Sequence, residues 1–120
     1  MVEEVCYKKN PWQVGMRRVK KIIEMENKRG LNAWWTGMYT ELPDIIVFDE
    51  DFRLIRVYEA TNYASPEFYI SREKAERYLT TLLKFSCDKV VVVSFESNLL
   101  DGKEYFTKHG IKVNVVGYQD

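Results

Sequence analysis

The chain has 120 residues, of which 18 are basic and 18 acidic, so its formal net charge is zero. Hydrophobic residues make up 46% of it, which excludes a disordered chain, and the length predicts one domain over residues 1–120, with residues 1–10 loosely held. Zero net charge excludes a uniformly basic DNA-coating protein, but it allows a nucleic-acid enzyme whose charges are segregated along the chain.

The sequence lacks the marks of an exported or membrane-embedded protein. Its apolar runs fall well short of the roughly 18 residues that a membrane span needs. The start, Met1–Glu4, is acidic and precedes no apolar segment, and Cys6 and Cys87 form no CxxC pair. We therefore expect a cytoplasmic protein with two ordinary thiols and no membrane partner.

The first predicted helix covers residues 12–29. Asn10 followed by Pro11 is typical of a helix start, apolar residues then recur with a helical period, and Gly30 is a typical stop. The aromatic segment that follows, residues 31–36, lies between two glycines and predicts a short strand.

The next two predicted strands form a hairpin. Residues 43–49 are a β-branched apolar run, and residues 52–60 continue after a turn at Glu50–Asp51. Residues 61–70 then read as a loop, and Ser71 is the predicted cap of the second helix.

The second helix is the clearest in the chain, because from Ala75 onward apolar residues recur at i, i+3, i+4, i+7 and i+8. After it, residues 89–95 predict a strand buried on both faces, residues 99–109 a short helix and residues 111–118 a last strand. The predicted order is α-β-β-β-α-β-α-β, an α/β sandwich with a central mixed sheet.

Two acidic residues stand out by their places on the hairpin. Asp44 follows a proline at the mouth of one strand, and Glu59 lies near the end of the next. Carboxylates that converge at strand ends suit a hard cation such as Mg²⁺, which can activate a water for attack on a phosphodiester. On spacing alone the alternative stays open that Asp44 caps a turn and Glu59 lies on a solvated face.

The order of the elements adds a resemblance. The chain resembles the PD-(D/E)xK, or restriction-endonuclease-like, nucleases, and in layout it is closest to the small archaeal Holliday-junction resolvases. The resemblance covers about residues 12–95 and rests on a first helix, Thr36-Gly37…Pro43-Asp44-Ile45-Ile46, Val57-Tyr58-Glu59-Ala60-Thr61, Tyr69-Ile70, an amphipathic helix and a hydrophobic strand.

The resemblance implies a restriction-endonuclease-like sandwich and a nuclease that cuts branched or duplex DNA as a homodimer. It implies that Asp44 and Glu59 bind Mg²⁺ or Mn²⁺. The homodimer face would be the second helix or the aromatic strands.

The chain departs from the family at the catalytic lysine, since Thr61 stands two residues after Glu59. A neutral hydroxyl cannot supply the field of an ammonium group. Within the family the lysine sometimes lies on a neighbouring element, so Lys74 or Arg72 at the start of the second helix is the candidate replacement. The alternative for Lys74 is a solvated helix residue. If Thr61 marks a site that lacks only its lysine, Thr61→Lys should gain cleavage.

A second departure concerns the first helix, where the family often has a glutamate one turn after the glycine. Gly15 is followed here by Met16-Arg17-Arg18-Val19. Glu24, later on the same helix, and Glu41, close to Asp44, are the candidates for that acid.

Candidate DNA contacts lie on the first helix and in the loop after Glu59. The helix carries Arg17, Arg18, Lys20 and Lys21 within five residues, which can neutralise phosphates or simply form a solvated face. In the loop, Asn62 and Tyr63 can bond a phosphate or stack on a base, or else form a turn.

Other conspicuous residues are given structural interpretations. Trp34–Trp35 is interpreted as one core and one surface aromatic, and His109 as a cap at a helix C-terminus.

The charge is segregated as a nucleic-acid enzyme would need. Residues 1–30 hold 8 basic and 4 acidic residues, residues 31–70 hold 2 and 7, and residues 71–120 hold 8 and 7. The candidate metal ligands lie in the acidic block and the candidate phosphate contacts in the basic one. Three hypotheses remain: a metal-dependent endonuclease, a non-catalytic DNA-binding or assembly protein of the same fold, and an unrelated α/β interaction module.

Overall fold

A computed structural model describes residues 11–37, 41–61, 63 and 65–117 of the chain. Its elements in chain order are helix α2 (Pro11–Lys28), strands β1 (Asn32–Trp35), β2 (Ile45–Phe48) and β3 (Leu54–Ala60), helix α3 (Arg72–Leu82), strand β4 (Asp88–Val93), the 3₁₀ turn η1 (Glu96–Asn98), helix α4 (Glu104–Thr107) and strand β5 (Lys112–Val115). The loosely held segment expected at residues 1–10 lies outside the described residues.

The strands form one mixed five-stranded sheet in the order β1-β2-β3-β4-β5. β1, β2 and β3 are antiparallel neighbours, whereas β3, β4 and β5 run parallel. The predicted α/β class, the β2–β3 hairpin and the order of helices and strands are therefore confirmed, with η1 as an addition.

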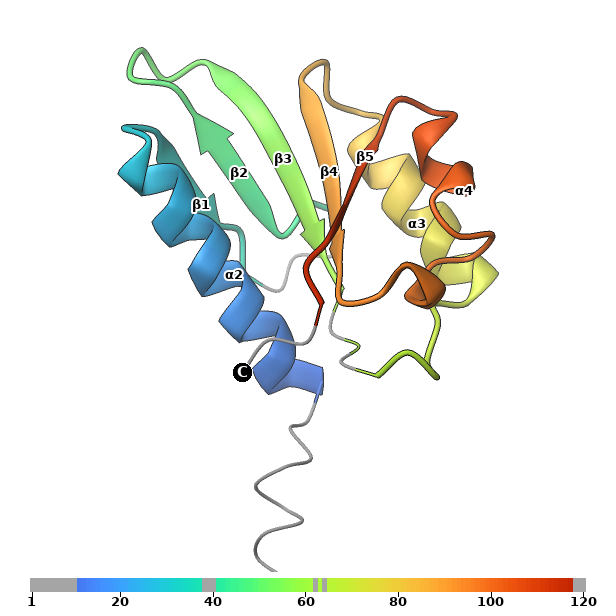
Figure 1. Ribbon diagram of the computed structural model, residues 1–120. Coiled ribbons are helices and arrows are strands. Elements are labelled where there is room, and N and C mark those ends of the chain that lie inside the picture. Colours follow the sequence, from blue (N-terminus) through green and yellow to red (C-terminus); the bar gives the residue numbers. More distant parts are fainter. Residues whose placement is uncertain (1–10, 38–40, 62, 64, 118–120) are drawn as a thin grey trace, which may run out of the picture.

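Helices cover both faces of the sheet, with α2 on one side and α3 and α4 on the other (Figure 1). Side chains alternate along β3, so that Tyr58 and Ala60 pack with Val19 and Ile22 of α2. Val57 points the other way and belongs to the cluster under α3 and α4. From Val57 onward the odd-numbered side chains of β3, including that of Glu59, are directed toward the α3 side. Ile55, beside the irregularity in the β2–β3 pairing, packs on the α2 cluster instead.

Strand β4 lies at the centre of both clusters. Its last four residues, Val90 to Val93, are all buried, with odd and even positions in opposite clusters. Each buried valine stabilises the fold by about 1.5–3 kcal/mol. The run that predicted a strand buried on both faces forms one, because β3 and β5 flank it and helices cover it.

The helix predicted over residues 99–109 is wrong in extent. Only Glu104–Thr107 is α-helical, and η1 precedes it. Between the two, Asp101 and Gly102 have φ values of 53° and 62°, which a right-handed helix cannot accommodate.

Within the described residues, no helix combines the length and the apolar character that crossing a membrane requires.

Candidate active site

Asp44 is held at the start of β2 by the end of β1. The Thr36 amide donates to the Asp44 carbonyl over 3.0 Å, and the Thr36 hydroxyl donates to the Pro43 carbonyl over 2.6 Å. The side chain is fixed separately, because Asp44 Oδ2 accepts a 2.8 Å hydrogen bond from the amide of Ala60 on β3. Backbone and carboxylate are therefore positioned by two different strands.

Glu59 lies opposite Asp44 on the neighbouring strand. The β2–β3 register pairs Ile45 with Tyr58, so the residue before Ile45 meets the residue after Tyr58. The Glu59 side chain is only 6% exposed and faces the α3 side of the sheet. The convergence that the sequence predicted for these two acids is present in the structure.

The two carboxyl groups perturb each other's ionisation. The pKa of Glu59 is raised to about 9, first by burial and then by the charge of Asp44 and a hydrogen bond with its carboxyl group. Burial also raises the pKa of Asp44, although the Ala60 amide and Glu59 partly offset that increase. Near neutral pH the carboxyl group of Glu59 therefore keeps its proton.

Lys74, at the start of α3, lies close enough to the two acids to interact with their charges. Ser71 caps the helix by accepting a 3.1 Å hydrogen bond from the Lys74 amide, which sets where the helix begins. Burial and the charge of Arg77 lower the pKa of Lys74, while Asp44 and Glu59 raise it. Of the two replacements considered for the motif lysine, the structure brings Lys74 to the acids, whereas Arg72 is exposed.

Two tyrosines hold the Lys74 ammonium group between them. Its Nζ lies 5.4 Å from the ring centroid of Tyr63 and 5.7 Å from that of Tyr78, within cation–π range. The pKa of Tyr78 is raised by burial and by the charges of Glu59 and Asp44, which keeps its phenol neutral. Sequence reasoning assigned Tyr78 to the apolar stripe, although its place four residues after Lys74 signalled a shared face.

Thr61 does not take the position of the missing lysine in space. It is fully buried, its amide donates to the Val92 carbonyl over 3.0 Å, and its hydroxyl accepts a 3.2 Å hydrogen bond from Arg18. The threonine therefore holds the chain where it leaves β3, and its hydroxyl is already engaged by Arg18.

Arg18 is a buried residue that joins α2 to the loop after β3. The interpretation of Arg18 as a DNA contact is therefore wrong. Arg18 is 4% exposed, and its guanidinium donates to the Thr61 carbonyl and, over 3.2 Å, to the Tyr63 carbonyl. The Ser94 hydroxyl donates to the same Tyr63 carbonyl over 2.8 Å. The tyrosine beside Lys74 is thereby anchored from both α2 and β4.

The remaining basic candidates of the first helix stay free for other contacts. Arg17, Lys20 and Lys21 are exposed on α2. Asn62 lies outside the described residues.

The two extra acids that the sequence suggested do not join the pair. Glu24 is exposed on α2 and Glu41 is exposed before β2. In the part of the chain that the structure describes, no cluster of three or more acids, histidines and cysteines is placed to hold a metal.

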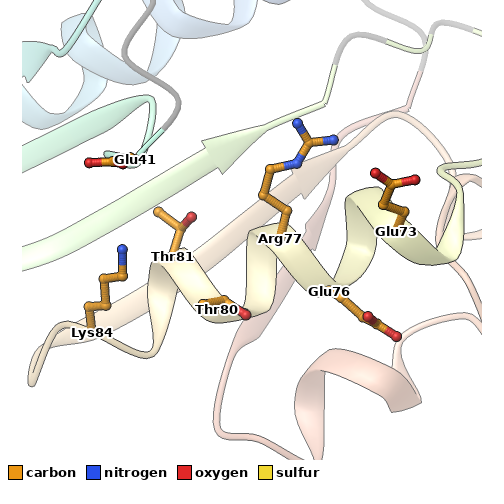
Figure 2. A pocket seen from close by; sticks show the side chains of 7 residues that line it. All are labelled: Glu41, Glu73, Glu76, Arg77, Thr80, Thr81 and Lys84. Carbon is orange, nitrogen blue, oxygen red and sulfur yellow. The ribbon is translucent and has the colours of Figure 1, made fainter.

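A groove of about 490 Å³ opens along α3 on the side of Glu41. Its lining residues are Glu41, Glu73, Glu76, Arg77, Thr80, Thr81 and Lys84. Figure 2 shows Arg77 and Glu73 rising from the same side of α3, whereas Glu76 points away. Arg77 thus places a second cation about one helical turn from Lys74.

The donor set fits a magnesium ion that is completed by substrate and water. Mg²⁺ in phosphoryl-transfer sites is bound by one or two carboxylates together with phosphate oxygens and waters. Burial raises the pKa of both carboxyl groups, and the charge of Asp44 raises that of Glu59 further. Asp44 and Glu59 would hold such a cation, whose charge would offset these increases.

Comparisons of the chain with family models, with curated proteins and with solved structures found no match. The functional argument therefore rests on the geometry of Asp44, Glu59 and Lys74.

Proposed function

We propose that the protein is a metal-dependent DNA endonuclease of the PD-(D/E)xK type, similar to Holliday-junction resolvases, that hydrolyses phosphodiester bonds. Asp44 and Glu59 hold Mg²⁺ or Mn²⁺, and Lys74 supplies the cation that the sequence motif lacks at Thr61. The carrying observation is the convergence of these three side chains from β2, β3 and α3.

Each side chain has a definite part in this chemistry. The chemistry that Mg²⁺ supplies when bound is polarisation of a phosphoryl oxygen and activation of a water. Asp44, fixed by the Ala60 amide, and Glu59, buried beneath α3, hold the ion at a set place. The charge of Lys74 interacts with both carboxyl groups and would stabilise the negative charge that develops on the phosphate.

The fold is compatible with this proposal. The sheet is mixed and covered on both faces, with one acid at the start of β2 and the other near the end of β3, and this α/β architecture is compatible with a restriction-endonuclease-like sandwich. The homodimer implied by the same resemblance belongs to the proposal.

Cleavage of branched and duplex DNA tests the proposal directly. Wild type should cut in Mg²⁺ or Mn²⁺, and both Asp44→Asn and Lys74→Met should lose about 100-fold or more of the rate. Lys103→Met is the matched control, because Lys103 is exposed and lies at the start of α4. Equal cutting by wild type and Asp44→Asn at every metal concentration would refute the proposal.

A second candidate is a catalytically inactive DNA-binding or assembly protein of the same fold. The observation that favours it is Thr61, a neutral residue at the motif position of the lysine and already bound to Arg18. Such a protein would bind DNA with a steep salt dependence and cut none, with or without metal.

A further inference from the structure

A second groove, of about 560 Å³, runs between α2 and the edge strand β1. It is lined by Met16, Arg17, Val19, Lys20, Ile23, Glu24 and Trp35. The lining is mostly apolar, with charged side chains contributed by α2. The groove lies on the α2 side of the sheet, away from the pocket beside α3.

Trp35 is the largest side chain of this groove, and it is 42% exposed. Ala33, two residues earlier on β1, packs into the α2 cluster, so alternation directs Trp35 to the same side. Trp34 points to the other face and is 57% exposed. The expectation that one of the two tryptophans lies in the core is therefore wrong, because the four-residue edge strand has too little cover to bury either.

The charges along the groove change from one end to the other. Arg17 and Lys20 are exposed near the start of α2, whereas Glu24 stands two turns after Arg17. Seven helical residues span about 10 Å, which is room for one or two bases. A half-exposed indole beside two cations complements a chain of flat rings joined by phosphates.

The groove and the candidate active site lie on opposite faces of the sheet. Trp35 pairs with Ile45, whose side chain belongs to the α2 cluster, whereas Glu59 is directed toward the α3 side. The groove is therefore a surface distinct from the acid pair, and it offers a ligand the indole of Trp35 together with the cations of Arg17 and Lys20.

We propose that this groove binds a single-stranded DNA segment, with an unpaired base stacked on Trp35 and its phosphates on Arg17 and Lys20. This inference rests on the proposed function and names its substrate class: DNA that carries an unpaired segment. Bases inside a continuous duplex have both faces covered by neighbours, so they cannot stack on Trp35.

The edge of β1 is not open along its length to a second strand of protein. The Ala33 amide donates to the Asn27 side chain of α2 over 3.2 Å, which caps the edge there. An acidic helical peptide could also pair with Arg17 and Lys20, but single-stranded DNA joins an anionic group to a flat ring in every unit, which matches two cations beside a half-exposed indole.

Binding of a labelled short oligothymidylate in EDTA, without cleavage, tests the proposal. Wild type should bind this single strand more tightly than a blunt duplex, and Trp35→Ala should weaken single-strand binding about tenfold. Trp34→Ala, on the other face of β1, is the matched control, and Trp35→Phe should keep most of the affinity because it keeps a stacking face. Thermal unfolding of each variant checks that the fold is retained.

A second set of variants tests the contribution of the two cations, Arg17 and Lys20. Arg17→Ala and Lys20→Ala should each weaken binding and reduce the salt slope by about 0.7, the value for one phosphate contact on a single strand. Lys28→Ala, at the far end of the same helix, should do neither.

Equal single-strand affinity in wild type and Trp35→Ala overturns the inference. So does loss of affinity in both Trp35→Ala and Trp35→Phe with equal loss in Trp34→Ala. A self-association or a peptide complex that depends on Trp35, without single-strand binding, overturns it as well. The two proposals fail separately: binding that depends on Trp35 without any cleavage refutes the endonuclease alone, and cleavage that is indifferent to Trp35 and to unpaired ends refutes the groove alone.

Discussion

Asp44 and Glu59 lie opposite each other where β2 begins and β3 ends, and their carboxyl groups are hydrogen-bonded to each other. The Ala60 amide holds the Asp44 carboxylate at 2.8 Å, and burial and the neighbouring charge raise the pKa of Glu59 to about 9. Folding thus keeps two acids together at a cost in stability. Sites that bind cations often have this property, because the ligand removes the penalty.

The first prediction concerns Glu59→Gln in the absence of metal. The folded protein keeps a proton on Glu59 that the unfolded chain, with a pKa near 4.5, loses. The contribution of Glu59 to the free energy of unfolding is therefore fully present below that value and should decrease as the pH rises toward 9. Glu59→Gln removes this decline and should stabilise the protein at about pH 8 by on the order of 2 kcal/mol.

Urea unfolding in EDTA at about pH 5 and about pH 8 measures this effect. Glu76→Gln, an exposed residue of α3, is the control and should leave the pH dependence of wild type unchanged. Added Mg²⁺ should stabilise wild type at the higher pH and leave Glu59→Gln nearly unaffected. A variant no more stable than wild type there contradicts the prediction.

The acid pair could be predicted from the sequence, because apolar runs mark the two strands and both acids lie at strand ends. The hairpin between the strands then dictated that Asp44 and Glu59 face each other. Lys74 was named from the sequence only as an alternative, since its reach toward the acids depends on where α3 packs. That packing is a tertiary property of Ala75 and Leu82 against Val57 and Val91.

The roles of the buried charges could not be read from the helix pattern. Arg18 and Glu26 are both polar, and an amphipathic reading of α2 assigns such residues to the solvent. Their burial depends on partners distant in sequence: the Thr61 and Tyr63 carbonyls for Arg18, and Arg56 for Glu26. Only the register between helix and sheet brings these partners together.

The second prediction is that Thr61→Lys gains no cleavage. The Thr61 hydroxyl is fully buried and lies 3.2 Å from the Arg18 guanidinium, so a lysine there would place a second cation beside a buried one. We expect a loss of about 2–4 kcal/mol in stability and no increase in rate. Thermal unfolding and cleavage assays measure both, and Thr80→Lys, at an exposed position of α3, controls for the added charge. A stable Thr61→Lys that cuts faster than wild type would restore the motif position as the catalytic one.

The third prediction separates the two arginines at the start of α2. Arg18→Met should destabilise the fold by about 3 kcal/mol, because the Thr61 and Tyr63 carbonyls lose their charged donor. Arg17→Met should change stability by less than about 0.5 kcal/mol, since its side chain is exposed. The effects on DNA binding should be the reverse of those on stability. Arg17→Met should flatten the salt dependence of binding, while folded Arg18→Met should keep it. Equal stability of the two variants would argue against a stabilising contact between Arg18 and the Thr61 and Tyr63 carbonyls.

The last prediction concerns Glu26, which is fully buried where α2 meets β3. Its carboxylate accepts hydrogen bonds from Arg56 and from the Tyr58 hydroxyl, both at 2.6 Å, and from Arg29 at 3.2 Å. Removing that charge leaves Arg56 without its closest partner and the Tyr58 hydroxyl without an acceptor. Glu26→Ala should therefore lower the free energy of unfolding by about 3–5 kcal/mol.

The matched control for Glu26→Ala is Glu24→Ala, two residues earlier on the exposed side of α2, which should cost less than about 0.5 kcal/mol. Tyr58→Phe keeps the ring and removes only the hydroxyl, so it should cost about 1–2 kcal/mol. Urea unfolding ranks the three variants. If Glu24→Ala were as damaging as Glu26→Ala, general helix propensity rather than the buried network would explain the loss. The position of α2, and of Arg18 against the loop after β3, would then not depend on the Glu26 contacts.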